Sequence, residues 1–237
     1  MNDTLFESPL PTWANRIAVF DLETTGLVLT DARIVTACAV ELDENGDIVG
    51  RNIEWLADPV IEIPAVAASV HGVTTERARA EGRPAGEVVA EIVTTLRGYF
   101  ERGIPVVAYN APYDFTILYH EAIRHGVPPL ENPTPVIDPL VLDKHFDKYR
   151  SGKRRLENAA QHYGVALTDA HNATADAVAA GRVAQAIFKK FPMPATAAEL
   201  HEAQVTWSKE IDLDFAKFMT AKDPSFKAVI GWPVKPI

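Results

Sequence analysis

The segment VFDLETTG, residues 19–26, ends a short apolar run that begins at Arg16. An apolar run of this length, stopped by a Thr-Thr-Gly turn, is typical of a buried β-strand. Asp21 and Glu23 are two positions apart, so both carboxylates should point to one face of that strand. Two adjacent carboxylates repel, and one of them must hold a proton unless a cation lies between them. Oxygen ligands without cysteine or paired histidine favour Mg²⁺ or Mn²⁺, whereas the alternative is two solvated acids at a strand end.

The composition is that of an ordinary globular protein, with 47% hydrophobic and 23% charged residues in a chain of 237. No apolar run approaches the roughly 20 residues that span a bilayer. The opening residues, MNDTLFESPLPTW, lack the basic and apolar regions of a signal peptide, so we expect a cytoplasmic protein. The single cysteine, Cys38, excludes an intramolecular disulfide and a zinc cluster built from cysteines. The net charge of -9 disfavours a nucleic-acid coat protein but not a nuclease, because a carboxylate metal site is itself acidic.

The pattern of apolar residues predicts a mixed α/β fold. The Asn45-Gly46 turn indicates a hairpin, and the later strands alternate with helices. We expect strands at 16–21, 34–42, 48–56, 105–109 and 136–138, and helices at 87–100, 110–125, 154–163 and 173–191. This order favours a mixed sheet with helices on its faces. In this interpretation residues 1–15 are a leader, 16–191 form the main domain and 192–237 form a helical appendage.

Two further segments carry acids at the starts of predicted helices. In the first, NAPYDF at 110–115, Asp114 lies in the first helical turn, where the helix dipole favours an acid without any function. In the second, HNATAD at 171–176, Asn172 is suited to the N-cap and Asp176 follows just inside the helix. A lone histidine such as His171 near a helix start is more often structural than catalytic. Each segment alone is therefore ambiguous.

Taken together, the three segments resemble the motifs of the DEDDh 3′→5′ exonucleases, the DnaQ-like family that includes the proofreading epsilon subunit of bacterial DNA polymerase III. Asp21 and Glu23 match the first motif, Asn110 and Asp114 the second, and His171 and Asp176 the third. The resemblance covers about residues 16–190 and includes the VHGVT segment at 70–74 and the helix before the third motif. It implies a ribonuclease H-like mixed sheet of five strands, the second antiparallel to the others.

The resemblance also implies roles for individual residues. Asp21, Glu23 and Asp176 would hold one metal ion, and Asp21 would bridge to a second ion supported by Asp114. Two divalent ions clamp the attacking and leaving oxygens of an in-line displacement, and His171 would take the proton of the attacking water. The products would be nucleoside 5′-monophosphates. The residues implied in substrate binding are Thr24, Thr25 and Leu27 around the terminal nucleotide, Asn110, and Phe115 beside the bases.

A basic cluster precedes the predicted helix at 154–163, at the end where the helix dipole disfavours cations. Its members are Lys148, Arg150, Lys153, Arg154 and Arg155. We expect Arg154 and Arg155 to contact the phosphate backbone of the substrate. The alternative is a solvated turn with no role in binding. Asp138, between the last strand and Pro139, is interpreted as the cap of a following helix and is left out of the site.

The family contains enzymes that act on DNA and others that trim RNA or short oligoribonucleotides. The oligoribonuclease type carries Met in the first motif where this chain has Thr24, which favours a DNA end and a role in proofreading or repair. A different class of function is an inactive module that grips nucleic-acid ends, but such a module is expected to lack a carboxylate. In the appendage, apolar residues recur at helical spacing at Leu200, Ala203, Trp207, Ile211, Phe215 and Phe218. We expect this stripe to pack on the catalytic domain, and the alternative is a DNA polymerase or sliding-clamp partner.

Overall fold

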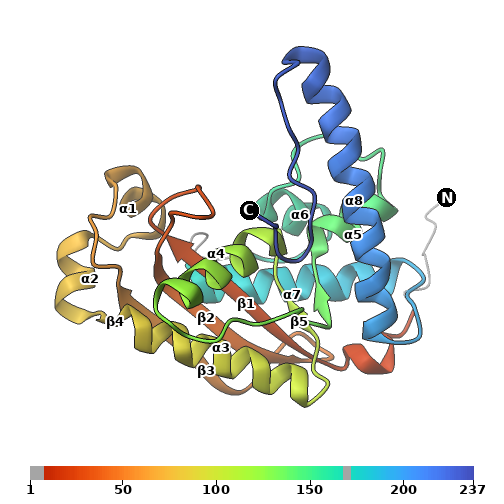
Figure 1. Ribbon diagram of the computed structural model, residues 1–237. Coiled ribbons are helices and arrows are strands. Elements are labelled where there is room, and N and C mark those ends of the chain that lie inside the picture. Colours follow the sequence, from red (N-terminus) through yellow and green to blue (C-terminus); the bar gives the residue numbers. More distant parts are fainter. Residues whose placement is uncertain (1–7, 168–171) are drawn as a thin grey trace.

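The computed structural model describes residues 8–167 and 172–237, and a six-stranded mixed sheet lies at its centre (Figure 1). The strand order is β4-β3-β2-β1-β5-β6, and β2 is antiparallel to its neighbours β1 and β3. The other pairs, β1 with β5, β5 with β6 and β3 with β4, are parallel. The strands are β1 (Arg16–Thr24), β2 (Ile34–Asp43), β3 (Ile48–Asp58), β4 (Arg83–Pro84), β5 (Val106–Val107) and β6 (Val136–Ile137).

The five expected strands are present, and the mixed α/β architecture is confirmed. The sixth strand, β4, was not expected because it has two residues and includes Pro84, too little for a periodic pattern. The helices are α1 (Ala65–His71), α2 (Thr75–Glu81), α3 (Ala85–Glu101), α4 (Ala111–Arg124), α5 (Pro139–Phe146), α6 (Leu156–His162), α7 (Ala173–Lys190) and α8 (Ala197–Lys222), with a 3-10 turn at Thr12–Ala14. Among these, α1 and α2 were not expected, because seven residues carry little periodicity of their own.

The alternation of β1 explains how the sheet is covered on both faces. Ala18 and Phe20 belong to one core, which they form with apolar side chains of α3 and α4. Ile17 and Val19 belong to the other core, which lies under α7. Since both faces are covered, β1 is an apolar run rather than an alternating strand, as expected for a central strand of such a sheet.

Helix α7 approaches the sheet closely because Gly181 has no side chain. A Cβ at this position would lie 2.5 Å from Cγ1 of Val19 and 2.6 Å from Cδ1 of Leu42. The glycine therefore lets the helix backbone rest on β1 and β2, and it sets the distance between α7 and the end of β1.

Helix α8 covers the β6 edge of the sheet and then projects beyond the rest of the molecule (Figure 1). From its start to Ile211, Leu200 is buried and Trp207 and Ile211 pack against the cores. Beyond Ile211, Phe215 and Phe218 are 52% and 56% exposed. The expected packing of the apolar stripe is thus correct as far as Ile211 and wrong for Phe215 and Phe218. Within the described residues, none of the helices is long and apolar enough to cross a membrane.

The close approach at Gly181 leads to a prediction about stability. Gly181→Ala should lower the free energy of unfolding by about 1–3 kcal/mol, because an added methyl group overpacks a filled core. Gly98→Ala is the matched control: Gly98 also lies inside a helix, but an added Cβ meets nothing within 4 Å. That change should raise stability by about 0.5–1 kcal/mol, since alanine costs less backbone entropy than glycine. Denaturant unfolding of the two variants measures both values, and equal effects of the same sign would contradict this account.

Candidate active site

Three carboxylates converge at the carboxyl end of β1. Asp21 and Glu23 lie on β1 just before an irregularity in its pairing with β2, and Asp176 comes from the first turn of α7. Each of the three offers an oxygen, and these oxygens all lie within 4.8 Å of one another. Residues separated by about 150 positions in the chain thus form one acidic cluster, as the motifs implied.

The third motif reaches this cluster through the start of α7. Asn172 is the N-cap, and its side-chain oxygen accepts hydrogen bonds from the backbone N–H groups of Thr174 and Ala175. The expected cap is therefore confirmed. Because Gly181 seats the helix on the sheet, the first turn carries Asp176 to the end of β1. His171 lies outside the described residues.

A fourth carboxylate, Asp114, approaches from the first turn of α4. It is buried, and its Oδ1 accepts a hydrogen bond from the backbone N–H of Leu22 at 3.0 Å. Leu22 lies between Asp21 and Glu23, so this bond ties the second motif directly to the first. Asn110, the residue before helix α4, has φ 63° and ψ 49°, a left-handed conformation that asparagine tolerates better than most residues.

Burial and mutual repulsion both raise the pKa values of Asp21 and Glu23 in this site. Burial, followed by the charges of Asp114, Glu23 and Asp176, raises the pKa of Asp21 well above its usual value. Burial and the charge of Asp176 raise the pKa of Glu23 from 4.5 to about 7. The raised pKa values of Asp21 and Glu23 thus come from burial and from the charges of neighbouring carboxylates. Such a set of oxygen donors fits a hard divalent cation, which would let the acids ionise together.

Asp138 is a site residue that the sequence interpretation omitted. It caps α5 as expected, because its Oδ1 accepts from the N–H of Leu140. Its carboxylate also accepts from the N–H groups of Asn110 and Ala111 at 2.9 and 3.0 Å. Asp138 therefore holds the backbone that leads into Asp114. The capping signal was visible in the sequence, but the second pair of bonds joins segments that only the folded chain brings together.

The turn after β1 contains the residues implied in nucleotide binding. The side chains of Thr24 and Thr25 are buried in it: Thr24 donates to the carbonyl of Gly26, and Thr25 accepts from the N–H of Arg33. Tyr113, next to Asp114, also donates to the carbonyl of Gly26 at 2.9 Å. Leu27 at the tip is 84% exposed. The threonines thus shape the turn, and Leu27 and its neighbour Val28 are exposed to solvent.

Two of the expected substrate contacts are wrong. Phe115 is 2% exposed and meets Phe20 edge to face in the core, so its ring is not available to a base. Arg154 forms an ion pair with the buried carboxylate of Asp143 at 2.6 Å and donates to nearby backbone carbonyls. Its guanidinium is already used to pair with Asp143, because a buried acid needs a charged partner, and so it is not available to a phosphate.

The other two substrate candidates remain open to solvent. Asn110 is exposed at the start of α4, although its N–H is held by Asp138. The side chain of Arg155 is 71% exposed and lies 3.9 Å from Glu157, a surface pair of little energetic weight. Lys148 and Lys153 of the basic cluster are also exposed, whereas Arg150 is paired with Asp143. Two arginines of the cluster, Arg150 and Arg154, therefore stabilise the fold through Asp143, whereas its other three cations are exposed to solvent.

Comparisons with known proteins agree with this geometry. The model of the exonuclease family RNase_T matches residues 18–184. A PolC-type DNA polymerase III of Pediococcus pentosaceus is 27% identical over 76% of this chain and 12% of its own length. A DNA polymerase III subunit epsilon-like protein of Rhodobacter capsulatus is 30% identical over 79% of this chain and 25% of its own. The chain thus spans at most a quarter of these relatives.

Among solved structures, the zinc-bound form of an E. coli exonuclease I complex with single-stranded DNA is similar to this fold. Its TM-score is 0.66 at 19% identity, over 85% of this chain and 45% of that chain. The mixed sheet with an antiparallel second strand is accordingly the ribonuclease H-like fold that the motifs implied.

The raised pKa of Glu23 predicts how the metal-free protein responds to pH. The folded protein binds this proton more tightly than the unfolded chain, so the stabilisation is present below pH 4.5 and is lost as pH rises through about 7. In EDTA, the free energy of unfolding obtained from thermal unfolding should therefore fall by about 1–2 kcal/mol over that pH range. This figure allows for solvent screening at a partly exposed site. Glu23→Gln should flatten this part of the profile. A wild-type profile that rises with pH and is unchanged in the variant would contradict the assignment.

Proposed function

The chain belongs to the RNase_T exonuclease family, and from that premise we propose that it removes single nucleotides from the 3′ end of single-stranded DNA. The observation that carries the proposal is the convergence of Asp21, Glu23 and Asp176, with Asp114 tied to the same strand end. Every carboxylate of the family's motifs is therefore present and close together. A module that only binds nucleic-acid ends would not need this closely spaced and mutually repelling set of acids.

We propose Mg²⁺ or Mn²⁺ as the metal, in two positions. Asp21, Glu23 and Asp176 would hold the first ion, and Asp21 together with Asp114 the second. Oxygen donors suit these ions, and the described part of the site offers carboxylates rather than sulfur. When bound, the ions would offset the charge that builds on the phosphate and orient the oxygens of the displacement. The zinc in the related exonuclease I complex is consistent with a divalent ion of this kind.

The remaining steps belong to the protein's own side chains. His171 is assigned as the general base by its place in the third motif, five residues before Asp176. It would accept a proton as the water oxygen bonds to phosphorus. The bond from phosphorus to the 3′ oxygen of the next nucleotide then breaks, and that oxygen takes a proton from solvent. The released product is a nucleoside 5′-monophosphate.

Substrate contacts are proposed for the exposed groups around the acidic cluster. Leu27, at the tip of the turn that Thr24 and Thr25 shape, would pack against the terminal base. Arg155 would contact a phosphate further along the strand, and Asn110 would lie beside the second motif. The preference for DNA over RNA rests on Thr24 in the first motif, and the single-stranded DNA of the exonuclease I complex is consistent with it.

Asp21→Asn should lower the rate of nucleotide release to the detection limit while the fold is retained, because it removes the carboxylate that both metal positions share. Asp214→Asn is the matched control, an exposed acid far along α8. The assay follows 5′-labelled single-stranded DNA and an RNA of equal sequence, each with Mg²⁺ and with EDTA. Wild-type digestion by the Asp21→Asn protein would exclude the proposed site. Faster digestion of RNA than of DNA would change the substrate but not the chemistry.

His171→Ala should reduce turnover by roughly 10²–10⁴-fold, the usual contribution of a general base. In the wild type, activity should fall as pH drops below the range where imidazole is neutral, since a protonated ring cannot accept the proton. The variant should lose that acidic limb of the profile while still binding DNA. If the pH profiles of variant and wild type coincide in shape, His171 has another role.

A further inference from the structure

β6 is the edge strand of the sheet, and side chains of α8 form hydrogen bonds with its outer backbone groups. Val136 and Ile137 pair with β5 on one side, which leaves the N–H and C=O of Val136 and the N–H of Asp138 facing outward. His201 Nδ1 accepts from the N–H of Val136 at 3.0 Å. The amide of Gln204 donates to the carbonyl of Val136 at 3.1 Å and accepts from the N–H of Asp138 at 2.7 Å. Helix α8 thus supplies the hydrogen bonds that a seventh strand would make.

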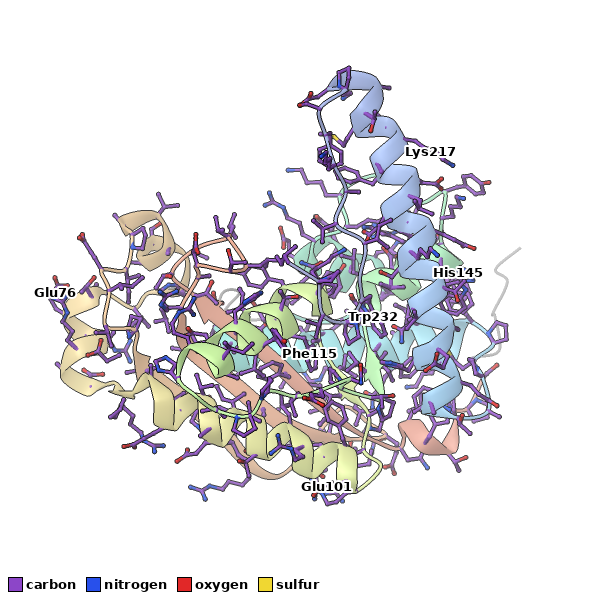
Figure 2. The ribbon with its side chains drawn as sticks, in the orientation of Figure 1. Glu76, Glu101, Phe115, His145, Lys217 and Trp232 are labelled. Carbon is purple, nitrogen blue, oxygen red and sulfur yellow. The ribbon has the colours of Figure 1, made fainter. Side chains whose placement is uncertain are left out.

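The chain then returns from the end of α8 to the same place. Residues 223–237, here called the C-terminal strap, run back from the projecting tip of the helix toward the start of α4 (Figure 1). Trp232 lies in this strap beside α8 (Figure 2), is buried in the core and donates from Nε1 to the Oδ2 of Asp138 at 3.4 Å. The N–H of Lys235 donates to Thr116, two residues beyond Asp114, at 2.9 Å. Its ammonium pairs with Asp212 of α8 at 2.5 Å.

Asp138 is the point where these contacts meet the catalytic motif. Helix α4 receives no side-chain cap from its own N-cap residue, Asn110, which has a left-handed backbone. The carboxylate of Asp138 accepts from the N–H groups of Asn110 and Ala111 instead, and so caps the helix from another part of the chain. A negative group is stabilised at a helix start, and its position sets the direction in which the first turn begins. Asp114 lies in that turn.

We propose that α8 and the C-terminal strap position the second acidic motif, with Trp232 and Gln204 acting as positioning residues through Asp138. Both elements lie beyond the residues matched by the family model, which end at 184. Gln204 holds the backbone of Asp138, Trp232 holds its carboxylate, and the carboxylate holds the start of α4. The role of Asp114 in metal binding rests on the proposed function.

The test uses the full chain and two variants that remove one contact each. Trp232→Phe keeps an aromatic ring but loses the N–H donor to Asp138, and Gln204→Met keeps the length of the side chain but loses both bonds to the β6 edge. Trp13→Phe is the matched control: Trp13 Nε1 donates to the carbonyl of Pro194 at 3.2 Å, and its ring packs on Phe188 in the other core. Unfolding temperatures show whether each variant is folded at the assay temperature.

Two readouts separate positioning from general stability. The first is the affinity for Mn²⁺ alone, measured by electron paramagnetic resonance without DNA. The second is the division between kcat and KM on 5′-labelled single-stranded DNA. Partners that orient metal-site residues typically contribute about 10- to 100-fold to metal affinity or activity. Trp232→Phe and Gln204→Met should weaken Mn²⁺ binding and lower kcat by about 10-fold with KM little changed, whereas Trp13→Phe should change neither.

The Asp138→Asn variant tests whether the effect passes through Asp138. Combined with Trp232→Phe, it should lower Mn²⁺ affinity by less than the product of the two single effects, since the contacts act in series. The proposal would be overturned if Trp232→Phe changed Mn²⁺ affinity no more than Trp13→Phe does. It would also be overturned if the losses of Mn²⁺ affinity in Trp232→Phe and Asp138→Asn multiplied in the double variant. If the wild type binds Mn²⁺ but digests no DNA, the proposed function fails, and the Mn²⁺ affinities alone decide the positioning role.

Discussion

Mutual repulsion among closely spaced, partly buried carboxylates is the constraint on which the site depends. Asp21, Glu23 and Asp176 place oxygens within 4.8 Å of one another, and the charge of Asp114 also acts on Asp21. In the absence of a cation this arrangement raises the pKa values of Asp21 and Glu23, so it works against folding at neutral pH. The rest of the domain must therefore hold four acids together against their own electrostatics.

The fold meets this constraint with backbone elements that are anchored elsewhere. The closeness of α7 to the sheet at Gly181 carries Asp176 to the end of β1. The N–H of Leu22 binds Asp114 and so joins α4 to the same strand. Each acid thus lies at the end of an element whose apolar face is buried in a core. Packing energy stabilises a geometry that the charges alone would disperse.

The start of α4 depends on hydrogen bonds from another segment of the chain. Its N-cap residue has a left-handed backbone and offers no side-chain cap, so the hydrogen bonds come from Asp138 at the end of β6. Asp138 is in turn held by Gln204 and Trp232 from the last part of the chain. Helix α8 and the C-terminal strap carry none of the sequence motifs, yet they contact Asp138, which supports the second motif. The contribution of such distant supports is common where a geometry must be held tightly.

Local patterns in the sequence determined the five main strands and the caps at Asn172 and Asp138, because periodicity and cap chemistry are short-range properties. The four acids were ambiguous one by one, and they were assigned to one site only through the resemblance of three segments to the family's motifs. The exposure of a side chain is not short-range. Phe115 was expected beside a base and lies in the core, and Arg154 was expected on a phosphate and neutralises a buried acid. The cap on α4 and the closed edge of β6 also depend on contacts between segments remote in the chain. Tertiary structure alone decided these features, since hydrogen bonds and burial follow from what packs together in space rather than from neighbours in sequence.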